Sequence, residues 1–344
     1  MTPKSFLLLS AATVVAIGLA VVTSTVTRVG DAVSQRGERL VPGLAQRAGD
    51  IAEITVDLGD DKTVMTLKDG VFLDQSGFPV SPDLPRRMVS ALALMTIEER
   101  KTSDASRLGE LKLEAPTSGA TAGEGERIVL ADRAGRTIAA VILGERDYTV
   151  GGTSGGQFVR RDGETRAFLV RGALDAPLSR SAYFDTQIVA IEAGDIASVA
   201  AYDGETVAFT LARDGDAMTL EAIPEDRQPD AAKVSRLANL LSPLRFNDVR
   251  RAVTDANPDG RRVVFATSGD FAVTMHRFGT PPEVGSDVDA WVRISVGPQP
   301  EGGVLPDRAQ AIADRVNGFD FKLNAADAEA LMRTKTSLLV ESES

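Results

Sequence analysis

The sequence contains no cysteine and one histidine, His276, in 344 residues. Without cysteine the chain has no disulfide, no thiol nucleophile and no cysteine-ligated zinc or iron–sulfur site. A single histidine excludes histidine-rich metal sites and leaves one candidate base for a serine–histidine mechanism. These absences exclude many chemistries and identify none.

Positive charge is also in deficit, because the formal net charge is −11 and the isoelectric point is near 4.8. An acidic chain repels polyanions, so we expect no nucleic-acid partner and no broad docking on an anionic lipid surface. Apolar residues make up 43% and charged residues 25%, which is typical of a globular protein. The length allows two ordinary domains.

The N-terminus carries an uncharged run between Lys4 and Arg28. As a helix, residues 5–27 would extend about 35 Å, enough to cross a hydrocarbon core of about 30 Å. We therefore expect residues 1–27 to be a transmembrane anchor that contacts the lipid bilayer. The alternative is a cleaved signal peptide, because Gly18–Ala20 resembles a cleavage site; the run continues past it, which favours the anchor.

Charges around this run say little about its orientation. Residues 28–47, a juxtamembrane connector, carry Arg28, Arg36 and Arg39 beside Asp31 and Glu38, so the positive-inside rule is nearly silent. The very short segment before the run is typical of a signal anchor. We expect the bulk of the chain outside the cytoplasm, which is compatible with the absence of cysteine.

An internal repeat organises the rest of the chain. Residues 48–52 (AGDIA) recur identically as residues 193–197. Further matches follow in the same order: Thr63–Gly70 with Thr206–Gly215, Pro82-Asp83 with Pro229-Asp230, Arg127–Gly144 with Arg262–Gly279, and Phe158–Arg160 with Trp291–Arg293. The period is far longer than a solenoid repeat, so the sequence predicts a duplicated domain.

Each half has strand patterns on both sides of one helix. Alternating apolar residues predict strands that begin at Ile51 and pair across a Gly-Asp-Asp turn with Val64–Leu67, with a third short strand at Val71–Leu73. Ser81 is predicted to cap the helix, with Pro82 at its first position. Strands return at Arg127–Ala131, Ile138–Leu143, Gln157–Arg160 and Ala167–Val170.

The second half repeats this pattern, with a helix that Pro229 is predicted to open. Its apolar stripe is Val234, Leu237, Leu240, Leu241 and Leu244. Strands before and after one helix predict an α+β fold with mainly antiparallel sheets. The absence of βαβ alternation excludes Rossmann and TIM-barrel architectures.

The C-terminal stretch departs from the repeat. It predicts a helix at Asp307–Val316, a short strand over Phe319–Leu323, and a last helix that Asn324 caps together with Asp327. The predicted organisation is a transmembrane anchor at 1–27, a connector at 28–47, a first α+β unit at 48–180, a second α+β unit at 181–300, and C-terminal helices with a tail at 301–344.

His276 is the first candidate functional residue because it is alone. It lies in a strand pattern and shares a face with Thr274, and its counterpart in the gap-free repeat alignment is Val141, which has no acid–base chemistry. No GxSxG motif supplies a nucleophile. A structural strand-face histidine is the favoured interpretation, against a general base.

Other motifs have equally plain interpretations. The glycine-rich run Gly151–Gly156 lacks the following lysine and helix of a phosphate loop, so it predicts a hairpin loop. The basic pairs Arg160-Arg161 and Arg250-Arg251 read as solvated strand ends that could also face an acidic partner surface. Acidic clusters fit turns and no calcium loop: Asp57/Asp60/Asp61, Asp214/Asp216 and Asp287/Asp289. We predict no catalytic, cofactor-binding or metal-binding residue, and no enzyme.

Several motifs along the chain are similar to those of a known family. They are Leu40–Leu44, Asp50–Ala52, Leu108-Gly109, Gly156–Arg161, Ala167–Val170 and Val316–Leu323. Together with the apolar N-terminus, they resemble the bacterial DUF4340 family, whose members are commonly described as gliding-motility-type ABC transporter auxiliary components. Two positions depart from the family pattern: Phe319 stands where a tryptophan is frequent, and Leu108–Pro116 is less regular.

The resemblance implies a membrane-anchored protein, single-pass in the bacterial inner membrane, with its bulk in the periplasm. It implies an ABC permease, an ATPase and a second auxiliary membrane subunit as partners, and it supplies no active-site residues. We therefore expect a non-enzymatic accessory or scaffold subunit of an exporter or envelope-lipid transporter. Two alternatives stay open: a periplasmic lipid- or glycan-binding module, and a carboxylate-dependent envelope hydrolase.

Overall fold

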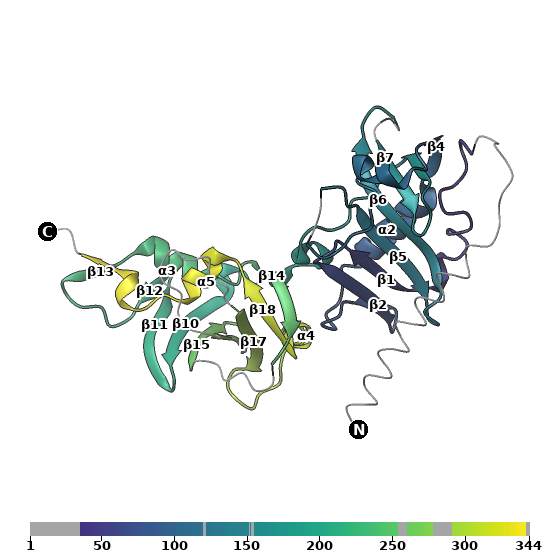
Figure 1. Cartoon of the computed structure of the whole chain (residues 1–344). Helices are drawn as coiled ribbons and strands as arrows, with labels where there is room; N and C mark the ends of the chain where they lie inside the picture. The colour runs from purple at the N-terminus through teal and green to yellow at the C-terminus, as the bar shows by residue number, and fades with distance from the viewer. Residues whose placement is uncertain are drawn as a thin grey trace, which may run out of the picture. The chain divides into compact units, whose positions relative to one another are not determined.

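A computed structural model describes residues 35–119, 122–150, 152, 155–253, 260–277 and 291–341 (Figure 1). The predicted anchor at residues 5–27 lies outside this part of the chain. Among the described residues, none of the helices has both the length and the apolar character that crossing a membrane requires.

Contacts divide the described chain into two compact units. The first holds residues 35–75 together with Pro79–Pro177, and the second holds Ser76–Phe78 together with the chain from Leu178 onward. Each unit is mainly an antiparallel sheet with few helices, which confirms the predicted α+β class. The finer domain boundaries stay predictions.

The first unit is an eight-stranded sheet with the order β3-β2-β1-β5-β6-β7-β8-β4, and every neighbouring pair is antiparallel. Its strands are β1 (Ile51–Asp57), β2 (Lys62–Lys68), β3 (Val71–Leu73), β4 (Thr96–Arg100), β5 (Glu126–Asp132), β6 (Thr137–Asp147), β7 (Gly156–Arg161) and β8 (Ala167–Arg171). Its helices are the 3₁₀ turn η1 (Ala48–Asp50), α2 (Asp83–Leu94) and the 3₁₀ segment η2 (Ala105–Leu111).

The second unit is a nine-stranded sheet with the order β12-β11-β10-β15-β16-β17-β18-β14-β9. Its strands are β9 (Gln187–Val189), β10 (Ile196–Asp203), β11 (Thr206–Asp214), β12 (Ala217–Leu220), β14 (Leu244–Arg251), β15 (Arg261–Thr267), β16 (Phe271–Arg277), β17 (Trp291–Pro298) and β18 (Phe319–Leu323). A separate pair joins β13 (Arg227–Pro229) to β19 (Leu339–Glu341). The helices are η4 (Arg180–Tyr183), η5 (Ala193–Asp195), α3 (Ala231–Ala238), α4 (Asp307–Val316), α5 (Ala325–Leu331) and η6 (Thr336–Leu338).

The two sheets share one strand order, with β9 added at the edge of the second. Matched positions pair identically: Ile54 lies opposite Leu130, and Val199 lies opposite Phe265. A β-bulge interrupts both pairings at the same place, just after the first residue of β1 and of β10. Bulges are local features that sequence specifies, so the repeated motifs encode the same register between β1 and β5 as between β10 and β15.

The repeated AGDIA motif forms the same local structure twice. Ala48–Asp50 and Ala193–Asp195 are both 3₁₀ turns, and a strand starts at the isoleucine that follows each. Both isoleucines are buried, at 3% and 1% exposure. The motif therefore sets where the first strand of each sheet begins.

Helix α2 packs the predicted apolar stripe into the first unit. Leu84, Met88, Leu92 and Met95 are all buried, which confirms that stripe. The predicted Ser81 cap is wrong: Pro82 is the N-cap residue, and no side chain caps the first turn.

Helix α3 begins at Ala231, two residues later than predicted. Pro229 ends β13 by pairing with Leu339, so it cannot open the helix. Asp230 is the cap instead, and its carboxylate accepts a hydrogen bond from the Lys233 amide at 3.2 Å. The predicted stripe is buried, but α3 ends at Ala238, so only Val234 and Leu237 lie on it. Leu240 and Leu241 lie in the turn that follows, and Leu244 belongs to β14.

Phe78 forms the centre of an aromatic cluster in the second unit. Its ring is fully buried and meets four rings edge to face at centroid distances of 5.1–5.8 Å, those of Phe184, Phe246, Phe319 and Phe321. Edge-to-face pairs stabilise a core beyond their buried area. Although Phe78 lies between β3 and α2 in sequence, it belongs to the core of the second unit.

The C-terminal predictions are confirmed almost residue for residue. Helix α4 spans Asp307–Val316, β18 spans Phe319–Leu323, and the Asn324 side chain caps α5 by accepting from the Asp327 amide at 2.9 Å. Strand β18 pairs with β14 and β17, so it takes the place in the second sheet that β8 takes in the first.

Candidate functional site

His276 lies on β16 between two arginines. Arg262 is directly opposite on β15, and Arg293 is directly opposite on β17. Burial lowers the pKa of His276, and the nearby charges of Arg262 and Arg293 lower it further. A serine nucleophile and a carboxylate would be needed here for a catalytic triad, whereas the positions facing this imidazole on both neighbouring strands are cationic.

Strand pairing gives His276 a different counterpart in the first unit from the one that the gap-free sequence alignment gives. Arg127 and Arg262 are matched positions; Arg262 lies opposite His276, whereas Arg127 lies opposite Ile142. The difference arises from a register shift between Leu130 and Ala131 that the second unit lacks in its pairing of β15 with β16. The predicted counterpart Val141 is therefore wrong by one position, because a gap-free alignment cannot show a bulge.

A row of side chains continues across this face of the second sheet. In strand order it contains Tyr202, Arg262, His276, Arg293, Asp320 and Arg250, each directly opposite the next. We call these six residues the cationic row.

Asp320 is the only carboxylate in the cationic row, and it is fully buried. It pairs with Arg293 at 2.8 Å and with Arg250 at 3.6 Å. The guanidinium of Arg262 lies over the Tyr202 ring, with its Cζ 4.3 Å from the ring centroid. The guanidinium of Arg250 lies over the Trp291 ring, with its Cζ 4.2 Å from the centroid. Stacking and pairing hold these long side chains in place.

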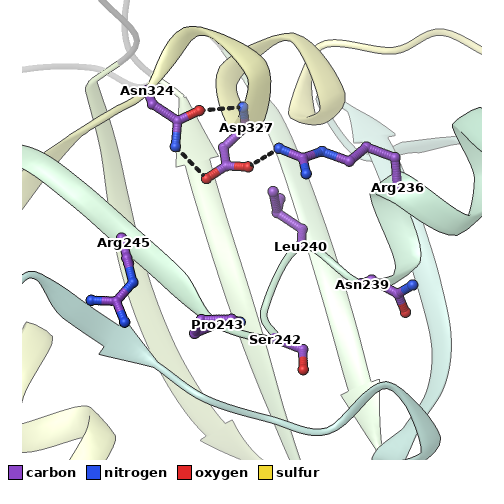
Figure 2. Close-up of a pocket in the computed structure, with 8 residues that line it drawn as sticks. All are labelled: Arg236, Asn239, Leu240, Ser242, Pro243, Arg245, Asn324 and Asp327. Atoms are coloured by element: carbon purple, nitrogen blue, oxygen red, sulfur yellow. Dashed lines mark hydrogen bonds and ion pairs between the residues drawn. The ribbon is translucent and has the colours of Figure 1, made fainter.

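One pocket of about 300 Å³ lies in the second unit (Figure 2). Its lining residues are Arg236, Asn239, Leu240, Ser242, Pro243, Arg245, Asn324 and Asp327. The Asp327 carboxylate accepts from Asn324 Nδ2 at 2.7 Å and from Arg236 Nη2 at 2.5 Å. Because these groups bond to one another, the pocket presents a capped helix end and contains no base aimed at a nucleophile.

A second pocket, of about 340 Å³, lies in the first unit. Its lining residues are Lys112, Glu124, Gly125, Glu126, Leu143, Gly144, Glu145, Arg146 and Tyr148. Burial raises the pKa of Glu126, although its carboxylate accepts a hydrogen bond from the Ala176 amide at 2.9 Å. A general acid needs a carboxyl group that keeps its proton to higher pH. Among the described residues, this pocket is therefore the place where the hydrolase alternative can be tested.

Of the two predicted basic pairs, Arg250-Arg251 is a solvated strand end, partly exposed and exposed at the end of β14, whereas Arg160-Arg161 is not. Arg160 is 7% exposed, and it donates to the carbonyl oxygens of Leu113 at 2.5 Å and Glu164 at 3.0 Å. Arg161 donates to the Leu40 carbonyl oxygen at 2.9 Å. Sequence could not show this, because a guanidinium that binds backbone carbonyls leaves no pattern in the chain.

The glycine-rich run and the acidic clusters behave as turns where they are described. Strand β7 begins at Gly156, so no helix follows the run. Asp60 accepts hydrogen bonds from the Ser118 hydroxyl at 2.7 Å and the Gly119 amide at 3.0 Å, which lower its pKa. Asp287 and Asp289 lie outside the described residues. Within those residues, no group of three histidine or carboxylate side chains is placed to hold a metal ion.

Comparison with known proteins gives one family match. The family model called domain of unknown function (DUF4340) matches residues 72–262, more than half of the chain. The match runs from β3 of the first unit into β15 of the second. No curated protein and no solved structure matches the chain.

Proposed function

Because the chain belongs to the DUF4340 family, we propose that it is a non-enzymatic accessory subunit of an ABC transporter. In this proposal residues 5–27 anchor it in the bacterial inner membrane, and the two sheet units stand in the periplasm. The observation that carries the proposal is the repeated sheet unit, with one strand order and the same register between its first matched strands. Repeated rigid sheets offer broad faces for subunits to pack on, which suits a scaffold.

We also infer that the two units arose by duplication of one ancestral unit. The support is the shared bulge after Ile51 and Ile196, together with the shared 3₁₀ turn before each. Such details are not required by an antiparallel sheet in general. A duplicated scaffold fits a machine whose permease has two related halves or two copies.

The direct test is purification of the membrane-anchored protein in mild detergent. The proposal predicts that an ABC permease, its ATPase and a second auxiliary membrane subunit come with it. A matched variant that lacks residues 1–27 should leave the membrane fraction and lose these partners. Recovery of the full chain alone, with no transporter subunit, would contradict the proposal.

The hydrolase alternative depends on the pocket around Glu126. There, a carboxyl group with a raised pKa lies near Glu124 and Glu145. The alternative predicts that Glu126→Gln abolishes hydrolysis of envelope glycans, whereas Asp175→Asn, beside it, does not. The lipid- or glycan-binding alternative predicts a bound lipid or glycan in native mass spectrometry of the purified chain.

A further inference from the structure

The second face of each sheet, opposite the face that carries the main core, differs sharply between the units. In the first unit, Ile142 and Ala167 on this face form a buried cluster with Leu108 and Leu113. Phe158 packs against the same cluster. This face therefore carries an apolar cluster, with Arg127 and Arg160 opposite Ile142 on the two neighbouring strands. The chain's own segment 105–113 covers the cluster, and its Leu113 carbonyl oxygen accepts a hydrogen bond from Arg160.

At matched positions the second sheet keeps the two arginines, Arg262 for Arg127 and Arg293 for Arg160, but replaces apolar residues between and beside them. Register aligns Ile142 with His276 and Ala167 with Asp320, and the sequence repeat aligns Phe158 with Trp291. Even the cation–ring contact recurs, with Lys101 over Phe158 in one unit and Arg250 over Trp291 in the other. The geometry has been kept, but the apolar residues that required a cover are gone.

The covering segment has no counterpart of its length. It lies in the connection from β4 to β5, residues 101–125, whereas β14 and β15 are joined by residues 252–260 alone. On the second sheet Ser295 is exposed, and His276, Trp291 and Arg293 are partly exposed. In the described part of the chain, the cationic row is therefore partly exposed at every member except Asp320, which is buried beneath its arginines.

The composition of this face is that of a binding surface. It carries the only tryptophan and the only histidine of the chain, together with Tyr202 and three arginines. Tryptophan, tyrosine and arginine are the residues enriched at protein-binding hot spots. The side chains of Arg262 and Arg293 retain 27% and 29% exposure, which leaves area for a partner to bury.

Charge and size select the kind of partner. The cationic row contains three arginines and one carboxylate, so it is positive although the chain carries a net charge of −11. Arg250 and Arg293 pair with Asp320, whereas Arg262 pairs with the exposed Glu205 outside the row at 3.7 Å. Six strands at about 4.8 Å spacing give the row a length of about 24 Å. Neither pocket described above includes it. A positive strip of this length outside any pocket fits an extended acidic segment better than a small anion in a cavity.

We propose that the cationic row docks an acidic segment of a partner protein, whose carboxylates pair with Arg262 and Arg293 while its apolar groups contact Trp291. The proposal rests on the accessory role above for the identity of that partner, a subunit of the same transporter. In the first unit the chain covers this face itself; in the second, a partner covers it.

Trp291 provides a local probe, because it is the only tryptophan of the chain. The experiment titrates the full chain in detergent with hexaglutamate and follows tryptophan fluorescence. We expect a saturable change that added salt weakens and that Arg262→Glu weakens about tenfold or more. Arg262→Gln, which keeps most of the shape without the charge, should lie in between, and far-UV circular dichroism checks that each variant folds.

Arg261→Glu is the matched control, because it makes the same charge change one residue away on the other face of β15. It should leave binding of hexaglutamate unchanged. Equal loss in both variants, no fluorescence change with hexaglutamate, or a response that anionic lipid vesicles or inorganic phosphate reproduce would overturn the proposal. Co-purification of a transporter together with an unchanged Arg262→Glu titration would refute this face alone and leave the accessory role standing.

Discussion

The two sheets share one strand order, but they differ on the face opposite the main core: that face is covered by the chain itself in the first unit and is partly exposed in the second. In the first unit the face carries Ile142, Ala167 and Phe158, and segment 105–113 buries it. In the second unit the matched positions carry His276, Asp320 and Trp291. An apolar face left in water destabilises the fold, whereas a polar face does not need a cover. A few substitutions on one face therefore decide whether a sheet of this strand order needs a cover from its own chain.

The largest expected effect concerns the core of the second unit. Phe78→Ala should destabilise that unit by about 3–5 kcal/mol, because the change removes a fully buried ring from a cluster of five. Denaturant unfolding followed by Trp291 fluorescence measures this unit specifically. Phe72→Ala, a partly exposed ring of the first unit, is the control and should leave the Trp291 transition in place. An unshifted transition in Phe78→Ala would contradict the assignment of Phe78 to the second core.

Exchanging the matched residues tests the comparison itself. Ile142→His should cost about 3 kcal/mol, because it places an imidazole in the fully buried cluster of the first unit. The reciprocal His276→Ile should change stability by less than about 1 kcal/mol, since His276 is partly exposed. Hydrogen exchange at the amides of β6 and β16 measures each unit separately. Similar costs for both exchanges would show that the two faces do not differ as described.

Removing the cover should have a somewhat smaller effect. Leu108→Ala should destabilise the first unit by about 2–3 kcal/mol, because Leu108 is 6% exposed and packs on Ile142 and Ala167. Leu111→Ala, at a partly buried position, is expected to cost less. The measurement is hydrogen exchange of β5 to β7. Equal protection in Leu108→Ala and the unmodified chain would mean that η2 does not close this face.

The smallest effect is a pH dependence confined to the second unit. The pKa of His276 is lowered in the folded state, so the folded chain binds fewer protons than the unfolded chain just below the ordinary histidine pKa of 6.5. The stability linked to His276 is therefore fully present above pH 6.5 and is lost as pH falls through 6.5 toward the folded pKa. Trp291-detected unfolding at pH 7.5 and pH 5.5 should show this loss, and His276→Ile should reduce it. An identical slope in His276→Ile would assign the effect to other groups.

Sequence periodicity predicted the elements that pack by one face. The stripe on α2, the span of α4, and the cap of α5 by Asn324 all follow from local spacing and capping chemistry. The repeat predicted which strands match, because the same short motifs recur in the same order.

Contacts between distant segments could not be predicted in this way. Phe78 lies in a connection with no periodicity, and Arg160 reaches a backbone carbonyl on a remote segment. The counterpart of His276 was missed because one bulge shifts the register by one residue. The accessible face of the second sheet could be recognised only from two structural observations together. These are the matched strand register of the two sheets and the shorter connection between β14 and β15.

The proposal that a partner covers the face which the second sheet leaves open can be tested by photo-crosslinking. A crosslinking residue is placed at Thr274 in cells that produce the whole complex, with Ala140, the matched position of the first sheet, as the control. We expect adducts at Thr274 with an acidic segment of one transporter subunit, and their loss when Arg262→Glu is added. Adducts that form equally at both positions, or that join Thr274 only to this chain or to lipid, would contradict it.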